Sequence, residues 1–320
     1  MDLLRFKGAS AAMAVTAALV LAPMGFAQNE GQAQGHAVIT VLPDHNSQTA
    51  ANVSQQDLQV KVNGKDATIT NVMPLRNNND HLEVVLMLDP SARTSMANQF
   101  GEIRNFINGL PQGTKASLAY MEYGTAHLVS PLTIDRKAVL NGLKIPSGMP
   151  GQNASAYICL SDLAKHWPSN DPAARRIVVM ISDGVDYYDP HFDMQDPYME
   201  AAITDSVRAN LVVYSIYWQN RGRFDSTGYA NASGQNLLQQ VTQATGGNSY
   251  WQGMGNPVSF QPYFKDIDKR LQNQFEVGIT APVSKPGVDS MKVKLNNGVG
   301  KLDAPQQIYL GHANNAGPAM

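Results

Sequence analysis

The chain has 320 residues, of which 16% are charged, and its formal net charge at pH 7 is −2. This near-neutral balance lacks the excess of Lys and Arg that nucleic-acid binding requires, so we expect no nucleic-acid partner. The single cysteine excludes an intramolecular disulfide, and the length suits one large domain with an appendage, or two domains.

The N-terminus has the features of an export signal. Arg5 and Lys7 precede a short apolar run, and small residues surround a candidate cleavage point after Ala27. The alternative is a membrane anchor, but the run from Ala9 to Leu21 is shorter than the ~20 residues that a spanning helix needs. We predict a signal peptide over residues 1–27, no membrane span after its removal, and export to the periplasm or the cell exterior.

A small β segment is expected next. Residues 28–35 are polar and are predicted to form a linker. Asn63 and Gly64 form a strong hairpin signal between two strands. The β segment covers residues 36–75, with strands at His36–Leu42, Leu58–Val62 and Ala67–Val72.

From Leu82 the pattern alternates between strands and helices, which predicts a doubly wound, mostly parallel α/β sheet over residues 80–274. The expected strands are Leu82–Leu88, Lys115–Tyr123, Ala126–Leu132, Ile177–Ser182, Leu211–Tyr217 and Ser249–Trp251. The expected helices are Met96–Leu110, Asp135–Leu143, Ser155–Trp167, Tyr198–Ala209, Asn236–Ala244 and Phe264–Gln274.

The chain is expected to return to strands over residues 275–311. These strands, predicted at Phe275–Thr280, Met291–Leu295 and Gln307–Leu310, would pack with residues 36–75 as one small β appendage. Residues 312–320 are small and polar, and we expect a disordered tail.

Two of the predicted strands end in an aspartate. Leu82–Leu88 is followed by Asp89, and Ile177–Ser182 is followed by Asp183. Apart from Glu83 and the final Ser182, both runs are apolar, as in parallel strands that are buried on both faces. Ligands of such sheets bind beyond the carboxyl ends of the strands, near the point where the strand order reverses. We therefore expect the two carboxylates to converge on one docking face.

These residues resemble a von Willebrand factor A domain, and within that superfamily the secreted bacterial proteins of the acidobacterial type. The resemblance covers residues 36–310 and rests on the two aspartate-ended strands together with the segments Asp57–Val60, Asn63–Lys65, Ala209–Ile216, Leu238–Gly247 and Leu271–Gly278. It implies a non-catalytic, adhesion-type protein-interaction module. The partner would be a protein or a cell-envelope ligand, docked at the carboxyl ends of the strands.

The resemblance also implies a metal-ion-dependent adhesion site, which the family builds from Asp-x-Ser-x-Ser, a later Thr and a second Asp. Asp89, Ser91 and Asp183 match this pattern, whereas Arg93 replaces the last Ser and only Ser155 lies near the expected Thr. Such oxygen ligands suit Mg²⁺ or Mn²⁺. The alternatives are purely structural roles, in which both aspartates close turns and Ser91 is a helix N-cap.

The direction of the Arg93 side chain determines whether a metal ion can bind at this site. An inward guanidinium at about 5 Å, with an effective dielectric constant of about 20, would repel a divalent ion by roughly 6–7 kcal/mol. Micromolar to millimolar metal binding provides only about 4–8 kcal/mol. We predict weak or no metal binding and no cofactor; an Mg²⁺- or Mn²⁺-dependent adhesion module is the alternative, which an outward Arg93 would favour.

The loop after Asp183 is acidic and contains two tyrosines, Tyr187 and Tyr188, with His191 nearby. Its acids are Asp186, Asp189, Asp193, Asp196 and Glu200. The loop is interpreted either as a solvated segment or as a partner contact, because exposed tyrosines anchor interfaces well. The predicted partner-binding residues are Asp89, Ser91, Arg93, Ser155, Asp183, Tyr187 and Tyr188, of which Asp89, Ser91 and Asp183 are the metal candidates.

The sequence has no signature of an enzyme. It contains no Gly-x-Ser-x-Gly nucleophile elbow, no metalloprotease helix motif and no phosphate-binding Gly-rich loop. Cys159 lies in an apolar stretch and is expected to be a buried helix residue rather than a nucleophile. We predict that the protein is not an enzyme, and a hydrolase is the least favoured alternative.

Overall fold

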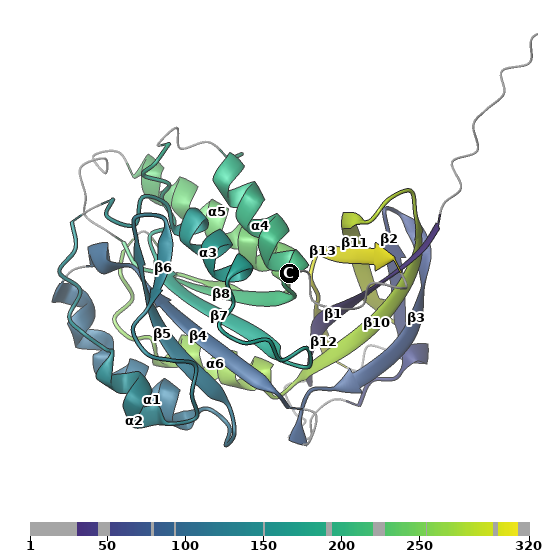
Figure 1. Ribbon diagram of the computed structural model, residues 1–320, viewed down its shortest axis with the longest axis horizontal. Coiled ribbons are helices and arrows are strands. Elements are labelled where there is room, and N and C mark those ends of the chain that lie inside the picture. Colours follow the sequence, from purple (N-terminus) through teal and green to yellow (C-terminus); the bar gives the residue numbers. More distant parts are fainter. Residues whose placement is uncertain are drawn as a thin grey trace, which may run out of the picture.

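The computed structural model describes residues 31–43, 52–77, 80–92, 94–149, 151–189, 194–219, 228–253, 255–296 and 300–312. They form an α/β unit and a β-barrel that lie side by side (Figure 1). The predicted signal peptide, the predicted tail beyond His312, and Arg93 lie outside the described residues. No helix within the described ranges is long and apolar enough to cross a membrane.

The α/β unit is built on a six-stranded sheet. Its order is β6 (Thr125–Leu128), β5 (Lys115–Glu122), β4 (Leu82–Leu88), β7 (Arg175–Ser182), β8 (Leu211–Tyr217) and β9 (Ser249–Tyr250). All neighbours are parallel except β5 and β6, which form an antiparallel hairpin. In chain order this is 3-2-1-4-5-6, the doubly wound order whose reversal lies between the first and fourth strands, here β4 and β7.

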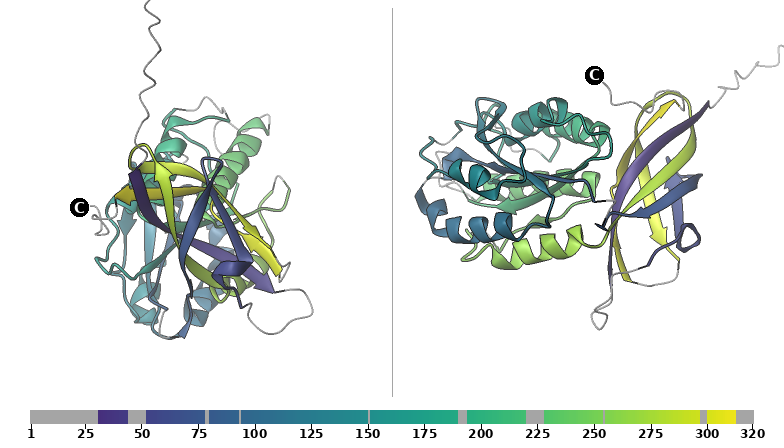
Figure 2. Two further views of the ribbon diagram at one scale, coloured as in Figure 1. Left: turned by 90° about the vertical axis from the view of Figure 1, so that its right-hand side faces the viewer. Right: turned by 60° about the horizontal axis from the view of Figure 1, so that its bottom comes forward.

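Helices cover both faces of this sheet (Figure 2). On one face lie α1 (Phe100–Gly109), α2 (Arg136–Asn141) and α6 (Gln261–Leu271); on the other lie α3 (Ala156–Lys165), α4 (Pro197–Arg208) and α5 (Tyr229–Thr245). Strand β4 shows the reason. Val84 and Leu86 pack in the core on the face of α1, α2 and α6, whereas Val85 and Met87 pack in the core on the face of α3, α4 and α5. Successive side chains of a strand point to opposite faces, so a continuous apolar run needs cover on both sides. The predicted α/β class is confirmed.

Several helix boundaries differ from the sequence expectation, and the starts of two helices differ most. The helix predicted from Met96 begins within the 3₁₀ helix η4 (Thr94–Gln99), which follows η3 (Pro90–Ala92), and regular α-helix starts only with α1. Met96 is nevertheless fully buried in the core, so its apolar character marks packing rather than regular helix. Helix α5 begins at Tyr229, seven residues before the predicted start at Asn236. The sequence pattern missed its first turns because they carry no apolar periodicity.

The second unit is a closed antiparallel barrel, which the sequence did not predict. Its six strands follow the ring β10 (Gln274–Val283), β3 (Lys65–Pro74), β2 (Leu58–Val62), β11 (Gly287–Leu295), β13 (Gln307–His312) and β1 (Gly31–Pro43), and β1 pairs again with β10. Strand β12 (Gly300–Asp303) pairs with the end of β1, and the short helix η1 (Gln55–Asp57) precedes β2. Closure leaves the barrel without the unpaired edges of an open sheet.

Strand β1 corrects the predicted linker, residues 28–35, over its described part from residue 31. It begins at Gly31, and residues 31–40 pair with β10. Gly35 lies in this strand, and the position requires glycine because a Cβ there would lie 2.3 Å from the Tyr309 carbonyl oxygen. A glycine in a polar stretch suggested flexibility, but it serves a close approach between strands.

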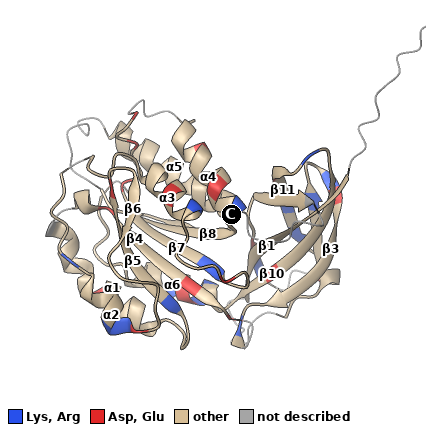
Figure 3. Ribbon diagram, viewed as in Figure 1, with Lys and Arg blue, Asp and Glu red and all other residues tan. Residues whose placement is uncertain are grey.

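One buried arginine contacts both segments in which the chain crosses from one unit to the other. Arg175, at the start of β7, donates to the Leu271 carbonyl at 2.6 Å and to Gln274 Oε1 at 2.9 Å, and it pairs with Asp80. Asp80 lies between β3 and β4, and Gln274 begins β10, so one side chain holds both crossings. Other charged residues are spread over both units (Figure 3).

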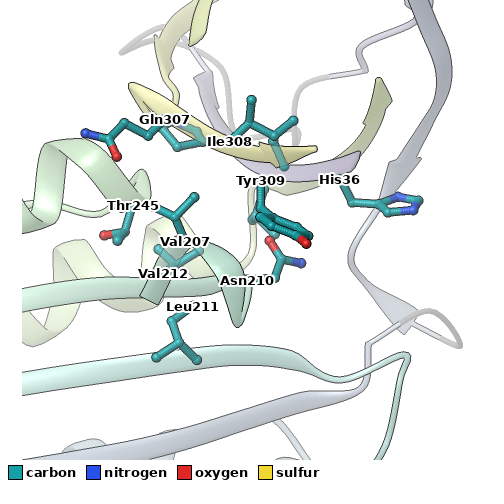
Figure 4. A pocket seen from close by; sticks show the side chains of 12 residues that line it. His36, Val207, Asn210, Leu211, Val212, Thr245, Gln307, Ile308 and Tyr309 are labelled. Atoms are coloured by element: carbon teal, nitrogen blue, oxygen red, sulfur yellow. The ribbon is translucent and has the colours of Figure 1, made fainter. Parts of the chain in front are cut away.

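The units also pack directly against each other. A cavity of about 20 Å³ lies between β1 and β13 of the barrel and the start of β8 (Figure 4). Its lining includes His36, Asn210, Leu211 and Tyr309. This volume is enough for about one water molecule, so the junction is closely packed.

Candidate functional site

Asp89 and Asp183 follow neighbouring parallel strands at the reversal of the strand order. Leu88 of β4 lies opposite Ile181 of β7, and the Asp89 N–H donates to the Ile181 carbonyl at 3.0 Å. Both aspartates therefore stand at the same edge of the sheet. Ser182 joins them, because its hydroxyl donates to Asp89 Oδ2 at 3.1 Å.

The Asp89 carboxylate is surrounded by donors. Oδ1 accepts from the N–H of Ser91 at 2.9 Å and from the Ser91 hydroxyl. Oδ2 accepts from Asn153 Nδ2 at 3.0 Å and from Ser182 Oγ. A carboxylate has about four lone-pair sites, so all of them are used. Burial nevertheless raises the pKa of Asp89, and these hydrogen bonds oppose that rise only in part.

Asp183 is equally buried but has fewer donors. Its Oδ1 accepts from the Val185 N–H at 3.0 Å, and its Oδ2 accepts from the Tyr187 hydroxyl at 2.7 Å. Burial raises the pKa of Asp183 to about 8, and the neighbouring charge of Asp89 adds to the rise. Two carboxyl groups this close do not both ionise easily, so the pair holds a proton near neutral pH.

Tyr187 covers this carboxyl pair. Its ring packs against Gly151, where a Cβ would lie 3.3 Å from Tyr187 Cβ. On the other side, the Tyr157 hydroxyl donates to the Gly184 carbonyl at 2.6 Å and fixes the turn after Asp183. Tyr187 is half-buried. Besides the predicted partner contact, it has a structural role, because its hydroxyl donates to Asp183.

The remaining predicted residues lie around this pair. Ser155 is fully buried and caps α3, accepting from the Tyr157 N–H at 3.3 Å. Tyr188 is 63% exposed and meets Tyr198 edge-on at 5.2 Å. Asp89, Ser91, Ser155 and Asp183 are at most 2% exposed, so in this conformation a docked partner would not touch them. Direct partner contact by these four, as predicted from the sequence, does not fit the structure.

Two residues of the site were missed in the sequence. Ser182 is the residue before Asp183, and its polar side chain at the end of an apolar strand was the available signal. Asn153 lies in the loop where a Thr was expected near Ala154. Ala154 has a φ of 61°, and this turn brings the Asn153 amide, rather than residue 154, to Asp89. The loop conformation could not be read from the sequence pattern.

The side chains as placed do not fit an Mg²⁺ or Mn²⁺ ion. Hard cations need free oxygen lone pairs. Those of Asp89 are occupied by donors, and the Tyr187 hydroxyl occupies Asp183 Oδ2. A metal would have to displace Asn153 Nδ2 and the Tyr187 hydroxyl. The described residues contain no group of three or more His, Cys, Asp or Glu that could hold a metal ion.

Two loops with exposed apolar side chains lie against this edge of the sheet. Met149 is 76% exposed and Val258 is 89% exposed. Both loops are joined to the segments after β4: the Gly148 N–H donates to the Pro90 carbonyl, and Gln99 Nε2 donates to the Val258 carbonyl. We call the following residues the apolar rim: Tyr123, Ile145, Met149, Tyr188, Met194, Tyr229, Trp251 and Val258. They include most of the large apolar side chains that are exposed within the described residues.

Cys159 is a buried helix residue. Its Sγ donates to the Asn153 carbonyl at 3.4 Å, and burial raises the pKa of the thiol. A nucleophilic cysteine needs a lowered pKa and access to solvent. The thiol therefore supports the loop that carries Asn153.

No protein-family model matches the chain, and no curated protein matches it. Among solved structures, an aerotolerance-related membrane protein from Bacteroides fragilis is 16% identical over 59% of this chain and 98% of that chain, with a TM-score of 0.43. The protein BatB from Bacteroides thetaiotaomicron is 15% identical over 59% and 97%, with a TM-score of 0.39. The pilus adhesin SpaC from Lactobacillus rhamnosus GG is 11% identical over 84% and 50%, with a TM-score of 0.43. At these TM-scores the likeness assigns neither a family nor a function to this chain.

Proposed function

We propose that the chain is an exported, non-catalytic interaction module of the von Willebrand factor A type. Its partner, a protein or a cell-envelope ligand, docks at the carboxyl ends of the sheet strands. The apolar rim is the observation that carries this proposal, because exposed apolar patches on soluble proteins mark interaction sites. Tyr188 is its best anchor, since exposed tyrosines supply large contact area with few rotatable bonds.

The buried carboxyl pair supports the docking face instead of touching the partner. Asp89 and Asp183 accept hydrogen bonds from Asn153 and Tyr187, which lie in loops that carry rim residues, and Asp89 also accepts one from Ser182 at the end of β7. These bonds fix the loops before a partner arrives. Pre-ordered loops bind more tightly because less conformational freedom is lost on association.

A comparison of rim variants tests the proposal. The mature protein, immobilised, is exposed to cell-envelope extract, in parallel with Tyr188→Ser and Met149→Ser. The control is Ile134→Ser: this residue is 64% exposed and precedes α2, at the opposite end of the sheet. We expect one partner to be retained by the wild type and the control and lost by both rim variants. Equal retention by the rim variants would place docking elsewhere.

We also propose that docking does not require a divalent cation. The occupied lone pairs of Asp89 support this, and Mg²⁺-dependent docking is the competing proposal. We expect isothermal titration with Mg²⁺ or Mn²⁺ to show no binding below millimolar concentration, and partner retention to survive a chelator. A micromolar dissociation constant, or loss of the partner in chelator, would establish the metal-dependent alternative.

The non-catalytic part of the proposal has its own test. A broad hydrolase screen of the mature protein should detect no turnover. Activity that disappears in Asp183→Ala would overturn it, because Asp183 lies at the edge where the sheet would bind a substrate.

Export is tested by the N-terminus of the mature protein. Sequencing the protein from periplasmic and culture fractions should find Gln28 first, after cleavage behind Ala27. Recovery of the intact N-terminus with the membrane fraction would favour an anchor instead.

A further inference from the structure

A second pair of acidic side chains is buried beside the first, and the proposed docking does not use it. Asp186 is 4% exposed and lies in the loop after β7; Asp196 is 7% exposed and is the N-cap of α4. Asp186 Oδ1 accepts from the Tyr188 N–H at 2.8 Å, and Asp196 Oδ1 accepts from the Met199 N–H at 2.7 Å. Each carboxyl group therefore orders its own backbone segment.

Among the described residues, the other carboxyl oxygen of Asp186 has no N–H or O–H donor. Asp186 Oδ2 is buried without a partner among the described residues, and the Asp196 carboxyl lies within hydrogen-bonding reach of the Asp186 side chain. Two carboxylates offer only acceptors to each other. A hydrogen bond between them requires that one of them carries a proton.

We propose that a proton shared by Asp186 and Asp196 clasps the loop after β7 to the first turn of α4, and that loss of this proton frees the loop. The clasp holds the segment that carries Tyr187 and Tyr188. With the proton present, the pair is a neutral acid bonded to a carboxylate. Without it, two buried negative charges face each other and separate.

The surroundings set the range in which the clasp responds. Burial raises the pKa of Asp186 to about 6, and Asp196 adds to the rise. A pKa above the ordinary value of 3.8 means that the protonated form is held in acid and is lost as the pH rises through about 6. The groups that face the pair are acids and phenols: Asp183 and Asp189 of the same loop, Tyr157 of α3, and Tyr188 with Tyr198 of α4. Further acids strengthen the preference for a proton.

Hydrogen exchange measured by mass spectrometry tests the clasp without a partner. Protection of peptides covering residues 184–189 and 194–199 is followed from pH 5 to pH 8, with exchange times scaled to the intrinsic rate at each pH. In the wild type we expect protection to fall at least about tenfold, with a midpoint near pH 6. A peptide from β4 (Leu82–Leu88) should show constant protection, which separates loop release from global unfolding.

Two isosteric variants test whether the shared proton causes the pH response. Asp186→Asn donates to Asp196 at every pH, so its loop should stay protected throughout. Asp196→Asn keeps an acceptable N-cap and should also remove the pH response, which gives a second route if the first variant folds poorly. Glu200→Gln, at an exposed acid in the first turn of α4, is the control and should keep the wild-type midpoint.

Three results would overturn the clasp. The first is a wild-type loop whose protection does not change with pH. The second is a wild-type midpoint that persists in both Asn variants. The third is recovery of protection at pH 7.5 on adding Ca²⁺, which would show that the pair binds a cation rather than a proton.

Discussion

At the scale of single residues, burial sets the chemistry of the two strand-end aspartates more than their type does. The sequence predicts Asp89 and Asp183 as ligands for a partner or a metal. In the structure they are nearly inaccessible, and both have raised pKa values because burial disfavours their charged forms. Asp89 is held by four donors, and Asp183 by two. The pair is therefore a structural support whose stability depends on pH.

Asp183→Asn should reveal this dependence. The pKa of Asp183 is about 8 in the folded chain and near 3.8 when unfolded, so its protonated form stabilises the fold in acid and that stability is lost as pH rises from about 4 to 8. Asn cannot ionise, and the Tyr187 hydroxyl can accept from its amide. Urea unfolding should find the variant close to wild type at pH 4 and more stable at pH 8, by roughly 1–3 kcal/mol. A variant that is less stable than wild type at pH 8 would contradict a proton-holding pair.

At the scale of elements, the position of α5 against the β7 turn depends on two glycines. Gly184 has a φ of 67°, in the left-handed region that glycine favours. Gly234 lies in α5, where a Cβ would fall 2.1 Å from the Asp183 carbonyl oxygen. The helix therefore approaches the backbone of the site directly.

Gly234→Ala should destabilise the fold although Ala is the better helix former. The clash with the Asp183 carbonyl should cost about 1–3 kcal/mol, more than the roughly 1 kcal/mol gained in helix propensity. Gly101→Ala is the matched control, since a Cβ there in α1 meets nothing within 4 Å. Thermal unfolding should show a lower midpoint for the first variant and an unchanged or higher one for the second. Equal midpoints would mean that α5 shifts freely.

At the scale of the whole molecule, the two units are coupled because the barrel draws strands from both ends of the chain. Strands β1 to β3 precede the α/β unit and β10 to β13 follow it. Arg175 sits where the chain crosses between the units in both directions. Its burial beside Asp80 makes this the junction that a single substitution should weaken most.

Arg175→Met should lower the free energy of unfolding by about 3–5 kcal/mol, because it leaves Asp80 and the Leu271 carbonyl without their buried donor. Limited proteolysis should then cut first near residues 75–81 or 272–274. Lys61→Met is the control: its pair with Asp66 is exposed, so stability should change by no more than about 0.5 kcal/mol. Loss of stability without cleavage at the crossings would show that Arg175 supports only the α/β core.

The α/β class could be predicted from the sequence because its signals are local. The apolar run Leu82–Leu88 and the helical stripe through Ile103 and Phe106 each reflect burial, and burial requires apolar side chains at fixed spacing. The edge of the sheet where Asp89 and Asp183 stand followed from the parallel order. The packing of the strands before and after the α/β unit as one β appendage was also expected, but their closure into a barrel was not, because the pairing of strands far apart in the chain leaves no local pattern.

The sequence by itself determined the repeating strand and helix pattern and the placement of two aspartates at strand ends. Only the tertiary structure decided that Asn153, Ser182 and Tyr187 enclose those aspartates, that Gly35 lies in a strand, and that the loops of Met149 and Val258 contact the segments after β4. The physical reason is that burial, hydrogen-bond partners and close backbone approaches arise between segments distant in the chain, and these contacts set whether a side chain binds, supports or holds a proton.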